Sequence, residues 1–279
     1  MTQKLLSRTE STAPLSAPVT ARRRTAPRRL RRFWPLATFG VLLLLWQIIV
    51  WLRVYPPFLV PAPASVFEAF LQVVQDGTLS KHTLVTLHEM LLGLAIGLSI
   101  GTVLGYLLAR IPLLESLLSP VIVAFQATPI VAYAPLLIVW FGTGPTSKII
   151  TCAVIVFFPA LMNTMVGLRN VPGSLRDLMR SLRASRWQMF IKLELPAALP
   201  VLLTGLKTSA TLAVIGAVVG EFVSQGSGLG FLVTIARNQY NTPLVFVAVF
   251  TMTALALSLY SLVSLLEWRL LAWQRRAGN

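Results

Sequence analysis

Six apolar stretches, each about 20 residues long, constrain the fold of this sequence more than any other feature. They lie within residues 35–52, 84–109, 116–141, 149–168, 201–223 and 244–271. A helix of about 20 apolar residues crosses the ~30 Å hydrocarbon core of a bilayer. The stretches are continuously apolar rather than alternating, which predicts helices and not the strands of a membrane barrel. We therefore expect an all-α integral membrane protein with six transmembrane helices.

The composition supports a membrane protein. Hydrophobic residues make up 56% of the chain and charged residues only 12%, about half the ~25% of an ordinary soluble domain. This excludes a typical water-soluble enzyme and a disordered scaffold. The net charge of +15 could suggest nucleic-acid binding, but no polar domain is present to carry a basic face. We expect membrane lipid as a partner and no nucleic acid.

Residues 1–34 differ from the rest of the chain. They are rich in Ser, Thr, Pro and Arg, and seven arginines fall between Arg22 and Arg32. We expect a disordered basic tail on the cytoplasmic side that contacts anionic lipid, followed by a transmembrane domain over residues 35–273. Ala62 and Ala64 resemble a signal-peptide cleavage site, but they lie far beyond the apolar stretch and we favour an uncleaved helix.

The basic residues predict the orientation. If the N-terminus is cytoplasmic, six helices place 20 of the 24 Lys and Arg residues on the inner side. The four on the outer side are Arg53, Lys81, Lys148 and Arg237. Because cytoplasmic loops carry the excess of Lys and Arg, we expect both termini to be cytoplasmic.

Glycines recur every four residues in the second stretch. The residues are Gly93, Gly97, Gly101 and Gly105, and the fifth stretch repeats the spacing with Gly216 and Gly220. This spacing keeps small residues on one helix face and lets another helix approach closely. We interpret them as helix-packing positions.

Polar residues inside the apolar stretches are candidates for a translocation path. The third stretch is interrupted by Gln126, Thr128 and Pro129, and proline frees backbone carbonyls that need a partner or a water-filled cavity. A kinked packing helix is the equally simple alternative. Glu221 ends an apolar stretch, and an ionisable group within a membrane indicates function by default. Glu89 lies closer to a helix end and reads as interfacial.

Nothing in the sequence predicts catalysis or metal binding. His82 and His88 lack the spacing of zinc ligands, and Cys152 is the single cysteine. We expect no catalytic residue and no metal site. An intramembrane enzyme or an ion-coupled secondary transporter remains an alternative of another class, although both need buried reactive or charged groups that are scarce here.

The longest loop, at about residues 169–200, is predicted to form an amphipathic helix. Leucines and aromatic residues fall near helical spacing between Asp177 and Phe190, with arginines between them. Such a helix can lie on lipid or insert its apolar ridge into a groove on a cytosolic partner.

This loop resembles the EAA loop of binding-protein-dependent ABC importer permeases. The resemblance rests on Asp177-Leu178-Met179, Arg183 and Leu193-Glu194-Leu195-Pro196. The loop departs from the family pattern because Asp replaces Glu, Leu178-Met179 replaces two small residues, and Arg183 stands at the glycine position. The resemblance implies a type I (MetI-like) permease fold and a loop that couples to the ATPase. The implied coupling residues are Asp177, Leu178, Met179, Leu182, Arg183, Ala184, Trp187, Phe190, Leu195 and Pro196.

Further segments resemble the nitrate, sulfonate, taurine and vitamin-precursor subgroup. They are residues 134–142 and residues 157–164, which include Asn163 as a further path candidate. Residues 126–129 and 213–223 look most similar to permeases for riboflavin, or next for the pyrimidine precursor of thiamine. An alkanesulfonate, taurine or nitrate is the alternative substrate. Lys207 is the one cation well inside the predicted spans, which favours a neutral heterocycle over an anion.

The resemblance also implies partners and location. We expect a homodimer in a bacterial cell membrane, with cytosolic ATP-binding subunits and an extracytoplasmic substrate-binding protein. The chain contains no Gly-Lys pair and therefore no phosphate-binding P-loop. We expect no cofactor in this chain, and ATP hydrolysis by a separate subunit.

Overall fold

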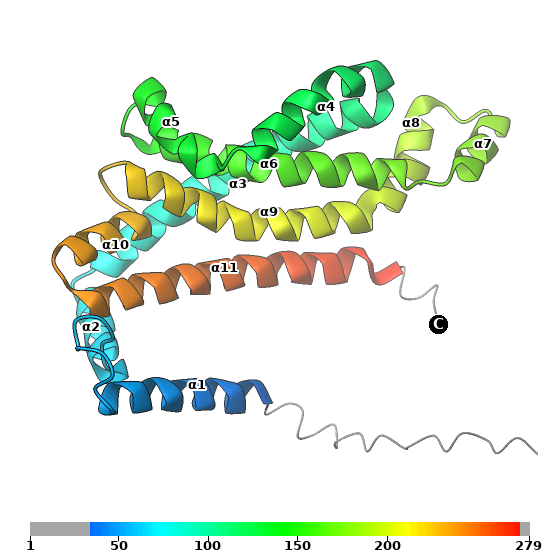
Figure 1. Ribbon diagram of the computed structural model, residues 1–279. Coiled ribbons are helices and arrows are strands. Elements are labelled where there is room, and N and C mark those ends of the chain that lie inside the picture. The colour runs from blue at the N-terminus through cyan, green and yellow to red at the C-terminus, as the bar shows by residue number, and fades with distance from the viewer. Residues whose placement is uncertain (1–33, 274–279) are drawn as a thin grey trace, which may run out of the picture. The chain divides into compact units, whose positions relative to one another are not determined.

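The computed structural model describes residues 34–273, and all regular structure in this range is helical. The helices are α1 (Trp34–Trp51), α2 (Pro63–Gln75), α3 (Thr78–Arg110), α4 (Pro112–Ala127), η2 (Ile130–Ala132), α5 (Ala134–Phe141), α6 (Pro145–Arg169), α7 (Gly173–Ser181), α8 (Arg186–Met189), η3 (Phe190–Glu194), α9 (Leu195–Val223), α10 (Leu229–Asn238) and α11 (Thr242–Leu270) (Figure 1). The predicted basic tail lies outside the described residues, except for Trp34, which begins α1. The chain divides into two units between Leu45 and Trp46, and the helix bundle belongs to the second.

Within residues 34–273, four segments are long and apolar enough to cross a membrane. They are Thr78–Arg110, Pro145–Arg169, Arg186–Val223 and Thr242–Leu270. Two shorter apolar helices, Ala37–Trp51 within α1 and Pro112–Ala127, fall in the first and third predicted spans. The all-helical fold and the six apolar segments agree with the sequence prediction.

The third predicted span is broken rather than continuous. Helix α4 ends at Ala127, and Thr128 takes an extended conformation with ψ of 129°. The next residue is Pro129, and a residue before proline is driven away from helical backbone angles. The chain becomes α-helical again at Ala134, with Pro135 in the first turn of α5, where its missing N–H is tolerated.

Helix α6 packs between α3 and α9. A Cβ added at Gly97 would lie 2.5 Å from the Ala153 carbonyl oxygen of α6, and one at Gly105 would lie 2.5 Å from the Leu161 carbonyl oxygen. On the other side of α6, a Cβ at Gly216 of α9 would lie 2.7 Å from Cys152 Cα. Gly93 and Gly101 also contact α6 at Cys152 and Phe157, and Gly220 contacts it at Lys148. The glycines of the sequence pattern therefore lie where three helices approach backbone to backbone.

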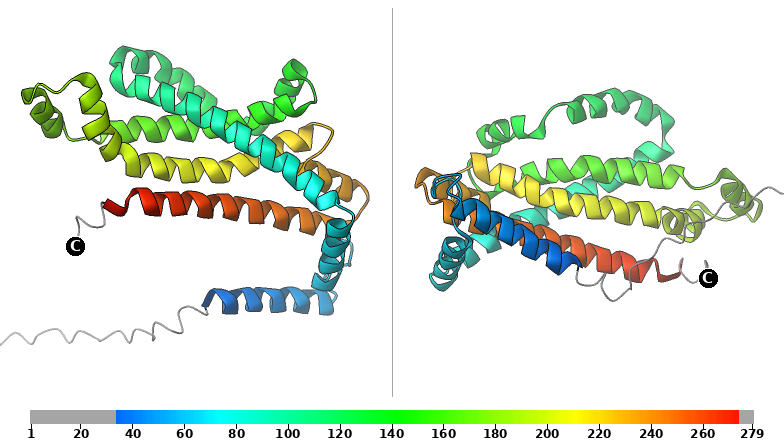
Figure 2. Two further views of the ribbon diagram at one scale, coloured as in Figure 1. Left: turned by 180° about the vertical axis from the view of Figure 1, so that it is seen from behind. Right: turned by 60° about the horizontal axis from the view of Figure 1, so that its bottom comes forward.

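Further helices pack around this three-helix core. Helix α11 packs against α9, and α2 and α10 pack against α11. Helices α7 and α8 lie at one end of α6 and α9, whereas α5 and α10 lie at the other end (Figures 1 and 2). Functional groups at the two ends are thus separated by the full length of the core.

Candidate functional site

The loop after α6 forms two short helices, and the single helix expected between Asp177 and Phe190 is wrong. Helix α7 ends at Ser181 and α8 begins at Arg186. Ser185 caps α8: its side chain accepts a hydrogen bond from the Gln188 N–H, and the Gln188 side chain accepts one from the Ser185 N–H. This capping box starts a new helix and ends the preceding one. Arg183 adopts a left-handed φ of 55°, so the turn forms even though glycine is absent.

The two helices present apolar side chains outward. The exposed fractions are 54% for Leu178 and 69% for both Leu182 and Trp187. Asp177 is also exposed, and among the described residues it pairs with Arg180, at 3.0 Å. Among the other expected coupling residues, Leu195 is exposed. Four more are half-buried: Met179, Ala184, Phe190 and Pro196. We call the exposed set Leu178, Leu182 and Trp187 the loop ridge.

A buried carboxylate fastens this loop to the bundle. The Glu194 side chain is 1% exposed, and its Oε2 lies 2.5 Å from Arg110 Nη2 at the end of α3. Its Oε1 lies 3.6 Å from Arg176 Nε of α7. Arg176 also donates a hydrogen bond of 2.7 Å to the Leu168 carbonyl at the end of α6. The sequence prediction did not include this network, and its one signal is that Glu194 is the single acid between Phe190 and Leu195.

The expected path residues lie on different elements. Gln126 and Pro129 are exposed, and the half-buried Thr128 donates its hydroxyl to the Ala124 carbonyl. Asn163 is half-buried on α6 and donates 2.8 Å to the Pro159 carbonyl. It lines a cavity of 220 Å³ formed by α3, α6 and α9, to which no residue of α4 contributes. The structure does not bring Asn163 together with Gln126.

Glu221 does not face an open path, which corrects the expectation from the sequence. Its side chain is fully buried, with 0% exposure. The Thr86 hydroxyl donates to its carboxylate at 2.6 Å and the Gly230 N–H at 2.5 Å. A Cβ at Gly228 would overlap the carboxylate. Glu221 therefore stabilises the beginning of α10 and its contact with α3, because these donors satisfy a charge that would otherwise be unpaired.

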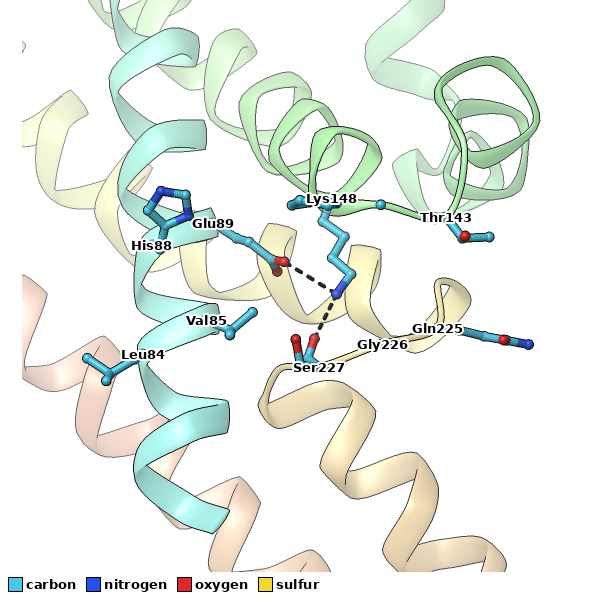
Figure 3. Close-up of a pocket in the computed structure, with 11 residues that line it drawn as sticks. Leu84, Val85, His88, Glu89, Thr143, Lys148, Gln225, Gly226 and Ser227 are labelled. Atoms are coloured by element: carbon cyan, nitrogen blue, oxygen red, sulfur yellow. Dashed lines mark hydrogen bonds and ion pairs between the residues drawn. The ribbon is translucent and has the colours of Figure 1, made fainter. Parts of the chain in front are cut away.

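A second buried charge lies beside Glu221 at the same end of the bundle. Glu89, near the start of α3, is 1% exposed and therefore buried inside the protein. Its Oε1 lies 3.3 Å from the Nζ of Lys148, which is also buried. Lys148 donates a further hydrogen bond of 2.7 Å to the Ser227 carbonyl, and the pair borders a pocket of 520 Å³ between α3, α6 and the segment before α10 (Figure 3).

Comparisons with known proteins identify the family. Residues 97–271 match the model of the binding-protein-dependent transport system inner membrane component. A riboflavin transport system permease of Chloroflexus aurantiacus is 47% identical, covering 88% of this chain and 94% of that protein. A formylaminopyrimidine transport permease of Halalkalibacterium halodurans is 31% identical, covering 87% and 96%. A taurine transport system permease of Escherichia coli is also 31% identical, covering 88% and 94%.

Solved structures agree on the fold. An inward-facing conformation of the MetNI methionine ABC transporter superposes with a TM-score of 0.61 at 20% identity, covering 70% of this chain and 97% of that chain. The sequence relatives, the family match and the helix arrangement are therefore consistent with one another. The chain belongs to the family of binding-protein-dependent transport system inner membrane components and is a permease subunit of an ABC importer.

Proposed function

We propose that this permease forms the membrane path for riboflavin, with the pyrimidine precursor of thiamine as the second choice. The observation that carries the proposal is the 47% identity with a riboflavin permease over most of both chains. The formylaminopyrimidine permease is more distant at 31%.

The ion pair of Lys207, the cation within the fifth predicted span, supports a neutral substrate over an anion. Lys207 forms an ion pair with Glu267 of α11 and lies 5.6 Å from the centre of the Tyr260 ring. Its charge is therefore engaged within the protein, and an anion would find no free Lys207 to bind. Sulfonate, taurine and nitrate are the alternative substrate class, because permeases for sulfonate and taurine are 31–34% identical to this chain.

The family defines which step of transport belongs to this subunit. The chain is the inner membrane component of a transport system that depends on a binding protein, and ATP is hydrolysed by separate subunits. We further propose a homodimer with cytoplasmic termini, in which the ATPase subunits dock on the loop ridge. Support comes from the exposure of the three apolar side chains, since anchors of this kind carry most of the energy of an interface.

The path is proposed to pass the break between α4 and α5. Gln126, Thr128 and Pro129 lie at this break, and α4 buries none of its residues within the protomer. A second copy facing this surface would enclose the polar break in a cavity, where irregular backbone is tolerated at membrane depth. Asn163, beside its own cavity, is a further candidate.

Uptake by the complete importer tests the substrate. The permease is co-expressed with its ATPase and binding protein in cells that require external riboflavin, and labelled riboflavin uptake is measured. We expect ATP-dependent uptake that excess unlabelled riboflavin abolishes and excess taurine leaves unchanged. Uptake of taurine with no uptake of riboflavin would show that the substrate class is wrong.

A further inference from the structure

A separate pocket lies between the end of α3 and the start of α8. Its volume is 450 Å³, and the residues that line it are Tyr106, Arg186, Trp187 and Phe190. The ring centroids of Tyr106 and Phe190 are 5.5 Å apart, and those of Trp187 and Phe190 are 6.0 Å apart. Three aromatic rings in mutual contact therefore form the walls, and one arginine lies beside them. We call this site the aromatic pocket.

The aromatic pocket lies where two segments that can cross the membrane have their ends. Tyr106 is four residues before the end of Thr78–Arg110, and the other three lining residues fall within the first five residues of Arg186–Val223. The ends of transmembrane helices lie at the level of the lipid head groups, where Trp and Tyr are enriched. The pocket is therefore at the depth of the head groups.

An exposed apolar surface continues from the pocket along α3. Val103 and Leu107 are both exposed. Residues three and four positions apart lie on one face of a helix, so these two residues share a face with Tyr106 and Arg110. This face runs from the pocket toward the middle of α3. An acyl chain can pack along it when the head group of the same lipid lies in the pocket.

The ion pairs around the pocket leave positive charge in excess. Arg110 and Arg176 share the single carboxylate of Glu194, and Arg110 also lies over the Tyr106 ring, 5.5 Å from its centre. Arg186 is exposed, and the described acids at this end of the bundle pair with other basic residues. The pocket is therefore electropositive and favours an anionic group.

We propose that the aromatic pocket binds an anionic phospholipid. The phosphate accepts hydrogen bonds from the Arg186 guanidinium, whose planar set of N–H groups matches phosphate oxygens. The glycerol backbone packs on the aromatic rings, and one acyl chain follows Val103 and Leu107 on α3. Basic pockets between transmembrane helices bind anionic head groups in this way. A zwitterionic phospholipid binds less tightly, because its own cation opposes the arginine.

The lipid site overlaps the loop ridge at one residue. Trp187 lines the pocket, whereas Leu178 and Leu182 of the ridge do not. An acidic side chain of the ATPase is the competing occupant, but such a side chain would leave the apolar face of α3 beside the pocket without a partner. The exposed Val103 and Leu107 therefore favour the lipid. The inference goes beyond the proposed function and does not depend on the transported substrate.

Lipid binding to the purified permease–ATPase complex tests the site. Native mass spectrometry measures the affinities for phosphatidylglycerol and for phosphatidylcholine with the same acyl chains, in the wild type, Arg186→Gln, Arg186→Lys and the control Arg180→Gln. Arg180 is exposed on α7 and does not line the pocket. We expect the wild type to prefer phosphatidylglycerol about fivefold or more, since one basic residue near anionic lipid contributes ~1 kcal/mol. Arg186→Gln should remove most of this preference, Arg186→Lys should retain most of it, and Arg180→Gln should leave it nearly unchanged.

The outcomes separate a lipid from the other occupants. Equal binding of the two lipids by the wild type would overturn the site even if Arg186→Gln failed to fold. An equal loss of preference in Arg180→Gln would show unspecific attraction to a basic loop and would overturn it as well. Glycerol 1-phosphate has the anionic group without acyl chains, and we expect it not to displace phosphatidylglycerol. Displacement would identify a site for free phosphate instead of lipid. Loss of ATPase assembly in Arg186→Gln, whichever lipid is present, would assign the pocket to the ATPase and reject the proposal.

Discussion

At the scale of single residues, Glu194 connects the ends of α3 and α6 to the loop that follows α6. Its carboxylate contacts Arg110 of α3 and Arg176 of α7, and Arg176 in turn donates a hydrogen bond to the Leu168 carbonyl near the end of α6. Removing one partner of a fully buried ion pair lowers the free energy of unfolding by about 3–5 kcal/mol. The arginines are partly exposed here, so the loss is at the lower end of that range.

Glu194→Gln should therefore loosen the loop and lower ATP-dependent uptake at least tenfold, while the protein still inserts in the membrane. Glu115→Gln is the matched control, since Glu115 pairs with Arg169 at an exposed position and exposed pairs contribute about 0–1 kcal/mol. Uptake and membrane content are measured together. Equal uptake in the two variants would contradict a coupling role for Glu194.

At the scale of helices, Gly97 places the backbones of α3 and α6 in contact. Gly97→Leu should lower the thermal unfolding midpoint of the purified protein, because overpacking costs about 1–3 kcal/mol and an added Cβ would lie 2.5 Å from the Ala153 carbonyl oxygen. Ala95→Leu on the exposed face of the same helix is the control, and its midpoint should stay near that of the wild type. A Gly97→Leu midpoint as high as that of Ala95→Leu would refute close packing at this glycine.

The loop ridge leads to a prediction at the same scale. Leu182→Asp or Trp187→Asp should abolish ATPase docking, so that substrate-stimulated ATP hydrolysis and uptake both fall at least tenfold with normal membrane insertion. Ser174→Asp adds the same charge on an exposed position of α7 without removing an apolar anchor. The hydrolysis and uptake of this control should remain normal. Full stimulation in both ridge variants would exclude the ridge as the docking element.

Helices and their packing faces could be predicted from the sequence, because apolar length and four-residue glycine spacing are local signals. The break between α7 and α8 could not be predicted from the sequence. It depends on the Ser185–Gln188 capping box and on the left-handed conformation of Arg183. The surroundings of Glu89, Lys148 and Glu221 could not be predicted from the sequence either. These residues are 59 and 73 positions apart along the chain, and only tertiary packing decides whether a charge at a helix end is buried.

At the scale of the whole molecule, three helices connect the charged groups at the two ends of the core. Helix α3 carries Glu89 and Arg110, and α9 runs from the residue after Glu194 to just beyond Glu221. Helix α6 carries Lys148 near its start and the Leu168 carbonyl near its end. Glu89 and Arg110 are 21 positions apart, which corresponds to ~31 Å of helix. A displacement of the loop ridge thus has a continuous packed route to the pocket beside Lys148, and Glu194 and Lys148 lie at its two ends.

This arrangement requires that the two ends face opposite sides of the membrane, which is the last prediction. Ser80 at the start of α3 and Ser174 at the start of α7 are both exposed, and the distribution of Lys and Arg places them outside and inside, respectively. In cells treated with a membrane-impermeant thiol reagent, Ser80→Cys should react and Ser174→Cys should react only after the membrane is opened. The native Cys152 is fully buried, so the protein without an introduced cysteine should not react with the reagent. Labelling of both introduced cysteines from the same side would rule out six spans with both termini in the cytoplasm.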